Sequence, residues 1–317
     1  MALETLSPTL YLSTAPPMAV GYAPGKPLTN ERSYGGHAYA QSIWAASLTL
    51  QDSGFRIHEA NGYWTQAGHA NRPFIYEITT LSQTRSFVLR QVTARQPTTP
   101  SDECPFPRSD ADKPRGPAAF VMTCSFKRAE EGPQYGLRFG KEKYGGIFAG
   151  GRDFEEFEKN ATLPGPNGRI TLADFPGLDV RTPNLEEYSK RNPGTGHRRL
   201  HVYRASMPMG EEVDVNLWAA AHAFVSDRAG LSVLVNAFGE KRLGMAGSLS
   251  HKMVFHVNSE ELRIGNGKEW FIQEMSSPRG GEGRGTIETR IWSPSGQLIV
   301  STMQDAMLRR PLEAKLS

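Results

Sequence analysis

The stretch GGHAYAQSIWAASLTL, residues 35–50, decides the fold. Ala38, Gln41, Ile43 and the apolar run after them are compatible with a largely buried helix, and the glycine pair lets another backbone approach its start. Strand-like runs follow at residues 58–66, 74–81, 86–96 and 118–127. One helix followed by adjacent antiparallel strands predicts a sheet with a single apolar face, which the helix must cover.

The same order recurs in the second half of the chain. A strand at 201–207 leads into a predicted helix at 213–236, and further strands are predicted at 248–256, 269–276, 285–293 and 297–309. Arg85 precedes the strand at 86–96, and Arg284 likewise precedes the strand at 285–293. Each of these is the third strand after the helix of its half. A repeat of this size indicates a duplicated domain.

This repeat sets the expected domain boundaries. We expect one unit at residues 31–128 and a second at 199–312. A polar segment at 129–198, rich in glycine and proline, is expected to connect them and to pack across the surface. Residues 1–30 are expected to form an irregular N-terminal arm, and residues 313–317 a tail.

The size, net charge and cysteine content of the chain exclude several classes of protein. The chain has 317 residues, 38% of them hydrophobic and 22% charged, which is typical of a globular protein with room for two domains. A net charge of +3 predicts no nucleic-acid partner. Cys104 and Cys124 form neither a disulfide framework nor a metal site, which fits a reducing compartment. We expect no metal and no cofactor.

The termini and the hydropathy bear on location. No apolar run approaches the ~18 residues that a membrane-spanning helix needs, so no membrane span is expected. The first residues, with Glu4 and several prolines, are unlike a signal peptide. The chain ends in Ala314, Lys315, Leu316 and Ser317, which displaces a peroxisome-like Ala-Lys-Leu by one residue. We therefore expect a cytoplasmic or peroxisomal protein without a functional address at this end.

Several segments, in this order, resemble the acyl-CoA thioesterase II family. They are Tyr34–His37 with Gln41, Arg85–Phe87 with Arg90 and Val92, Ala223–Asp227, Ser248–His251 with Phe255 and His256, Ser277 and Pro278 with Arg284 and Gly285, and Ser301–Asp305. The resemblance implies an α+β fold of the double hot-dog type, with two tandem units that each wrap an antiparallel sheet round a long helix. It also implies hydrolysis of acyl-CoA thioesters without a metal.

The resemblance implies a catalytic site in which an Asp, a Ser or Thr, and a Gln hold and activate a water. The Gln falls on Gln304 and the Ser or Thr on Ser277, but the Asp falls on Ser250, which is a departure from the family. An amide and an unactivated hydroxyl are not bases at neutral pH. Because general-base assistance contributes roughly 10²–10⁴ in rate, the missing carboxylate matters.

Four other side chains are candidates to replace that base. His251 and Asp305 each adjoin an expected site residue, but neighbouring residues of a strand face opposite sides of a sheet. Glu274 and Glu282 lie near Ser277, and Glu282 sits in a glycine-rich loop.

Five residues are candidates for substrate binding. Gly36, at the start of the first helix, offers backbone N–H groups to a thioester oxygen or a phosphate, although close packing would also explain it. His37 and Asn61 are candidates to line the same cleft. Arg279 and Arg284 flank a glycine-rich hairpin and either meet the phosphates of CoA or belong to a solvated turn.

We therefore predict a hydrolase of an acyl-CoA or acyl-carrier thioester, in which Ser277 and Gln304 position the water. The departure at Ser250 keeps two alternatives open. One is a diverged double hot-dog enzyme, such as a dehydratase, isomerase or cyclase of a polyketide-like or secondary-metabolite intermediate. The other is a non-catalytic acyl-binding protein. The sequence is also compatible with assembly into a homo-oligomer.

Overall fold

A computed structural model describes most of the chain. The described residues are 2–20, 32–51, 54–148, 154–159, 162–165, 168–171, 175–192, 197–208, 213–238, 245–257, 260–265 and 267–309. The expected tail at 313–317, including Ala314–Leu316, lies outside them. The chain forms two compact units. The first contains Met1–Gln134, Glu212–Arg228 and Ser250–Arg263, and the second contains Tyr135–Glu211, Ala229–Leu249 and Ile264–Ser317.

The first unit contains an antiparallel sheet with the strand order β1-β2-β6-β7-β8-β5-β14. The strands are β1 (Leu3–Ser7), β2 (Leu10–Ser13), β5 (Phe55–Trp64), β6 (Ile75–Gln83), β7 (Phe87–Pro97), β8 (Arg115–Arg128) and the second part of β14 (Met245–Phe255). Strands β5 to β8 match the four predicted runs. Strands β1 and β2 were expected to be irregular, but Leu12 is fully buried against Ile75 and Ala111, which anchors β2.

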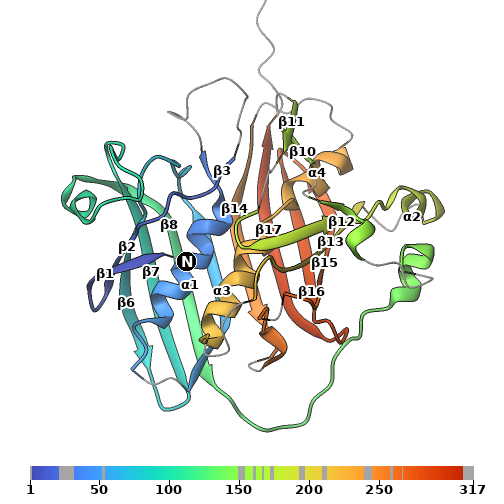
Figure 1. Cartoon of the computed structure of the whole chain (residues 1–317), viewed down its shortest axis with the longest axis horizontal. Coiled ribbons are helices and arrows are strands. Elements are labelled where there is room, and N and C mark those ends of the chain that lie inside the picture. Colours follow the sequence, from blue (N-terminus) through green and yellow to red (C-terminus); the bar gives the residue numbers. More distant parts are fainter. Residues whose placement is uncertain are drawn as a thin grey trace, which may run out of the picture. The chain divides into compact units, whose positions relative to one another are not determined.

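Helix α1 (Gly35–Ser47) lies across this sheet (Figure 1). Its alanines bury small side chains, and the hydroxyl of Tyr39 donates a hydrogen bond to the carbonyl of Ala60 on β5 at 3.0 Å. Helix α3 (Val215–Ser226) packs against α1 in the same unit. A Cβ at Gly36 would lie 2.6 Å from the carbonyl oxygen of Phe224, so this close approach requires the glycine.

The second unit contains a sheet with the strand order β14-β17-β16-β15-β13-β12-β9. The strands are the first part of β14, then β17 (Leu298–Arg309), β16 (Arg284–Trp292), β15 (Phe271–Gly281), β13 (His197–Ala205), β12 (Leu178–Thr182) and β9 (Glu158–Lys159). Helix α4 (Gly230–Phe238) covers one face, where Leu234 packs with Ile287 and Ala306, and Val233 with Met275. We call this the α4 face.

The single helix predicted at 213–236 is wrong in one respect, because the chain forms two helices there. Ala229 lies between α3 and α4 with φ +62°, a left-handed conformation that interrupts helical geometry. The break separates α3, in the first unit, from α4, in the second.

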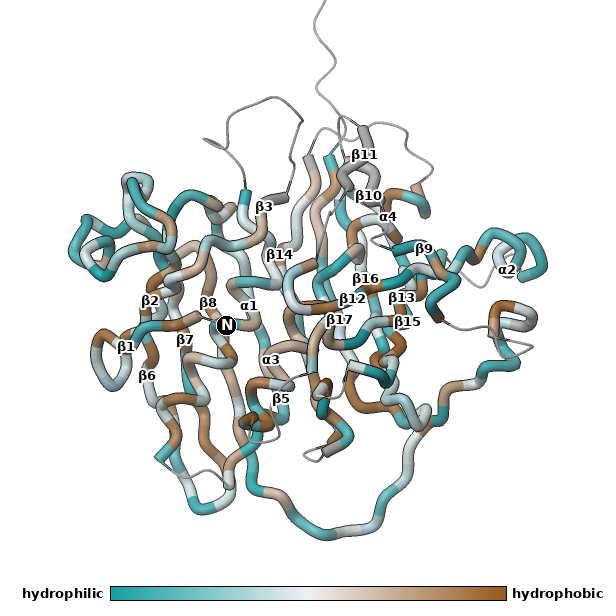
Figure 2. Tube along the Cα trace, viewed as in Figure 1, coloured by the Kyte–Doolittle hydropathy of each residue, from teal (hydrophilic) through white to brown (hydrophobic). Residues whose placement is uncertain are grey.

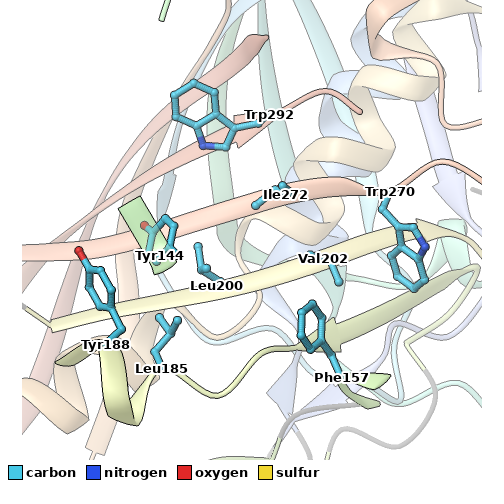
Figure 3. Close-up of a cluster of buried hydrophobic side chains, with 9 residues drawn as sticks. All are labelled: Tyr144, Phe157, Leu185, Tyr188, Leu200, Val202, Trp270, Ile272 and Trp292. Carbon is cyan, nitrogen blue, oxygen red and sulfur yellow. The ribbon is translucent and has the colours of Figure 1, made fainter. Parts of the chain in front are cut away.

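The segment expected to connect the units instead builds part of the second one. It supplies β9 and β12 at the edge of the sheet, together with η3 (Lys141–Ile147), η4 (Phe154–Glu156) and α2 (Glu186–Arg191). The helical pieces η3, η4 and α2 pack on the face opposite α4. Side chains of the segment and of the sheet form the cluster in Figure 3, made of Tyr144, Phe157, Leu185, Tyr188, Leu200, Val202, Trp270, Ile272 and Trp292. The second sheet is therefore covered by α4 on one face and by this segment over part of the other, where Glu288, Arg290 and Met303 stay exposed.

Short elements complete the described chain. They are β3 (Ala19–Val20), β4 (Arg32–Ser33), η2 (Arg108–Asp112), β10 (Thr162–Gly165), β11 (Gly168–Thr171) and η5 (Glu260–Leu262). Figure 2 shows hydrophobic residues along the long strands and a hydrophilic α2. Among the helices of the described residues, none is both long and apolar enough to cross a membrane.

Candidate active site

Ser277 and Gln304 lie in one row on the α4 face. Ile287 of β16 pairs with Gln304 of β17. A bulge in β15 places Ser277 and Pro278 together opposite Ile287, because Ser276 pairs with Glu288 and the next register pair is Arg279 with Thr286. Ser277 and Gln304 are both buried, and two strand spacings place their Cα atoms about 10 Å apart.

The side chain of Gln304 is held from two sides. Its Nε2 donates a hydrogen bond to the Oγ of Ser248 on β14 at 2.6 Å. Its Oε1 lies against the first turn of α4, where a Cβ at Gly230 would be only 2.7 Å away. A buried amide needs hydrogen-bond partners, and this arrangement fixes its direction on the α4 face.

Strand β13 adds basic side chains to the same face. His197 pairs directly with Ser277, Arg199 with Met275, and His201 with Gln273. The alternate residues Leu200 and Val202 point to the opposite face, into the cluster of Figure 3. The sequence prediction began this strand at His201 and so missed His197 and Arg199. Alternation of basic and apolar residues over 199–202 was a signal for Arg199, whereas residues 197–199 are all basic and give no such signal for His197.

Glu274, a candidate replacement base, faces away from Ser277. Its carboxylate accepts hydrogen bonds from Lys143 Nζ at 2.5 Å, from the hydroxyl of Tyr144 and from Arg198 Nη1 at 3.3 Å. Burial alone would raise the pKa of Glu274, but the hydrogen bonds from Lys143 and Tyr144 and the charges of Lys143 and Arg198 lower it. Glu274 is thus an ionised structural carboxylate on the opposite face of the sheet.

The hairpin between β15 and β16 carries the other candidates near Ser277. Glu282 and Gly283 form its tip with φ +55° and +73°, and the side chain of Glu282 is exposed. Arg284 pairs with Asp305 at 3.0 Å, and Arg279 is exposed. The contact of either arginine with a phosphate stays a prediction.

Ser250 belongs to the first unit. It is half-buried on β14 and pairs with Tyr63 of β5, whose side chain is exposed. Its neighbour His251 is buried, with Nε2 at 3.2 Å from the Oγ of Ser226, and burial lowers its pKa to about 3. His251 is therefore neutral and a weak base. Of the three expected catalytic residues, Ser277 and Gln304 are brought together within one unit.

The remaining candidates also lie in the first unit. His37, in the first turn of α1, has an Nε2 without a hydrogen-bond partner among the described residues, and burial lowers its pKa to about 4. A Cβ at Gly35 would lie 2.8 Å from Oδ2 of Asp227. The start of α1, where the sequence predicted contact with a thioester oxygen or a phosphate, therefore already lies beside a carboxylate of the protein. Packing thus accounts for the glycine pair. Asn61 is half-buried on β5, opposite Lys252. Substrate contacts of Gly36, His37 and Asn61 stay predictions.

Comparison with known proteins bears on both halves of the chain. Residues 25–107 match the model of the acyl-CoA thioesterase N-terminal domain, and residues 158–308 match that of the C-terminal domain. Mouse acyl-coenzyme A thioesterase 8 is 22% identical over 299 residues, which cover 89% of this chain and 81% of the relative.

Solved structures show a similar fold. An acyl-CoA thioesterase II from Mycobacterium marinum aligns with a TM-score of 0.67 at 22% identity, covering 99% of this chain and 97% of that structure. A conserved protein of unknown function with a hot-dog fold, from Alicyclobacillus acidocaldarius, aligns with a TM-score of 0.63 at 15% identity, covering 98% of this chain and 97% of that structure. The expected α+β double hot-dog fold is confirmed. Since the two family models together span well over half of the chain, the protein belongs to the acyl-CoA thioesterase family.

Proposed function

We propose that the protein hydrolyses an acyl thioester of coenzyme A or of an acyl carrier on the α4 face of its second unit. The observation that carries this proposal is the row formed by Ser277, Ile287 and Gln304, in which two polar side chains flank an apolar one beneath α4. Membership of the acyl-CoA thioesterase family supports the reaction class.

In this mechanism, the side chains of Ser277 and Gln304 hold a water above Ile287. The water oxygen attacks the thioester carbonyl carbon, and the carbon–sulfur bond breaks as the tetrahedral intermediate collapses. The products are a carboxylic acid and the free thiol, which takes up a proton. Fixed hydrogen-bond donors at such a position stabilise the developing negative charge on the carbonyl oxygen.

The proton of the water needs an acceptor, and His197 is the best placed on this face. It pairs directly with Ser277, and paired residues of neighbouring antiparallel strands have Cα atoms about 4.5–5.5 Å apart with side chains on the same side. A neutral imidazole has a ring nitrogen that can accept a proton. We infer that His197 supplies the general base that Ser250 does not.

The test is release of free thiol from a panel of saturated acyl-CoA substrates. Gln304→Ala is expected to lower kcat by about 10²–10³, the usual effect of removing a group that stabilises the transition state. Met303→Ala is the matched control, because Met303 is adjacent in the strand but exposed on the other face. Urea unfolding of both variants separates a catalytic loss from a loss of folding.

The outcomes separate the alternatives. Equal rates for the wild type and Gln304→Ala would reject the site. No thiol release from any substrate, together with a change in the mass of the acyl group, would favour a dehydratase or cyclase. Binding of acyl-CoA without any conversion would favour an acyl-binding protein.

A further inference from the structure

Arg199 carries a charge that the described structure does not neutralise. Its Nε donates to Nε2 of His201 at 3.1 Å, and its Nη1 donates to the Oγ of Ser232 on α4 at 3.1 Å. Both acceptors are uncharged, and Ser232 is itself held by its bond to the carbonyl of Ala229 at 2.6 Å. Within the described part of the chain, no carboxylate lies within ion-pair distance of the guanidinium.

The surroundings of Arg199 disfavour its charge. The residue is half-buried beneath α4, and burial lowers its pKa, although the more distant charge of Glu158 acts in the opposite direction. A cation in such a place is costly unless an anion meets it. Its two hydrogen bonds fix the guanidinium and leave N–H groups available, which is the arrangement that binds a carboxylate well.

Arg199 lies beside the expected position of the thioester. It pairs with Met275, and Ser277 is two residues further along β15, so Arg199 and Ser277 are diagonal neighbours on one face. Such neighbours have Cα atoms about 7–8 Å apart, which long side chains span. An anion held by Arg199 would therefore sit only a few bonds from the reacting carbonyl.

That position selects the acyl side of the substrate. In a coenzyme A thioester, the phosphates are separated from the sulfur by the whole pantetheine arm, so they do not reach a group next to the carbonyl. We propose that Arg199 binds a carboxylate carried by the acyl group, so that the protein prefers short dicarboxylyl thioesters. The position of the thioester in this proposal rests on the proposed function.

The experiment compares glutaryl-CoA with its neutral monomethyl ester for the wild type, Arg199→Gln and Arg199→Lys. The wild type is expected to favour glutaryl-CoA in kcat/KM. Arg199→Gln should lose at least about tenfold on glutaryl-CoA, as expected for a lost charged hydrogen bond, and less than about threefold on the ester. Arg199→Lys should retain part of the preference. Arg290→Gln, at an exposed site, is the control and should change neither value.

Two further measurements separate recognition of the acyl carboxylate from recognition of phosphate, and binding from turnover. The same pair of acyl groups is presented on N-acetylcysteamine, which has no phosphate, and the preference should persist. Binding of a non-hydrolysable glutaryl-CoA analogue with carbon in place of sulfur is measured by calorimetry. If the protein releases no thiol, the proposed function fails, but weaker binding of this analogue by Arg199→Gln would still support the carboxylate contact.

Three results would overturn the inference. An equal loss on both acyl groups would assign Arg199 to the reaction itself. A loss seen only with coenzyme A thioesters would assign it to phosphate. Unchanged turnover and unchanged analogue binding in Arg199→Gln would leave it no role in recognition.

Discussion

At position 250 a hydroxyl stands where the family resemblance implies a carboxylate, and the site can be tested by restoring it. Ser250 is half-buried, so the carboxylate of an Asp at this position would stay partly solvated. The family resemblance implies that Ser250→Asp raises kcat for thioester hydrolysis by about tenfold or more, because a carboxylate adds a general base. Ser250→Asn has the same shape without the charge and should not. Equal kcat values for Asp and Asn would remove position 250 from the mechanism.

His197 can be tested directly as the proposed base. His197→Gln should be slower by about 10²–10⁴, because an amide cannot accept the proton of the attacking water. His256→Gln, at an exposed histidine of the first unit, should keep the wild-type kcat/KM. An unchanged kcat/KM in His197→Gln would assign the proton to another group.

Individual residues were the hardest level to predict from sequence. Ser277 and Gln304 are predicted from segments that resemble a family, and the structure places them on one face, while their catalytic roles stay predictions. His197 and Arg199 were missed, since their relevance depends on which residue of β15 they pair with, and strand register is a tertiary property. Glu274 shows the converse, because its three partners come from distant segments that make it structural.

Among the elements, α4 controls the amide of Gln304. Gly230→Ala would place a methyl group 2.7 Å from Gln304 Oε1, so the amide must move. Alanine is also the better helix former by about 1 kcal/mol, which opposes any loss of stability. We expect kcat to fall by about tenfold while the urea midpoint changes little. Gly247→Ala, where a Cβ meets nothing within 4 Å, is the control. Full activity of Gly230→Ala would separate α4 from the chemistry.

The segment that covers the other face of the second sheet is anchored at Glu274. Glu274→Gln should cost about 1–2 kcal/mol in unfolding free energy, because Lys143 and Arg198 lose their counter-charge while remaining partly solvated. The folded-state pKa of Glu274 is lowered, so its contribution is complete above the ordinary carboxyl range and disappears as pH falls through the folded-state value.

The difference in unfolding free energy between wild type and Glu274→Gln should therefore shrink below about pH 4, which urea titrations at several pH values would reveal. Glu187→Gln, in an exposed pair with Lys190, should have almost no effect at any pH. A difference that is constant down to pH 2 would contradict the assigned charge.

The strands were predictable because their apolar residues alternate or run continuously, whereas two elements were not. At the break, Gly230 is a poor helix former, but a single glycine does not by itself end a helix, and the left-handed conformation falls on the preceding Ala229. The sequence predicts a connection in place of the covering segment, because that segment is polar and rich in glycine and proline. Its aromatic residues, such as Tyr144 and Tyr188, bury themselves only once the sheet exists (Figure 3).

For the whole molecule, the composition of the first unit predicts how the chain can be divided. That unit contains α3 and the second part of β14, which come from the second half of the sequence. A fragment of residues 1–134 lacks both and exposes the side of α1 that α3 covers. We expect this fragment to show no cooperative unfolding by circular dichroism. When residues 212–263 are joined to it by a peptide linker, cooperative unfolding should return. Cooperative unfolding of the short fragment would show that the first unit is self-sufficient.

The interleaving of the two units also bears on synthesis at the ribosome. Translation proceeds from the N-terminus, and domains generally fold as they emerge. Here the N-terminal unit stays incomplete until Arg263 has been added, after Tyr135–Glu211 of the other unit has already been synthesised. Its nascent strands must wait with apolar surface exposed, and a pause or truncation before that residue would leave a chain in need of chaperones.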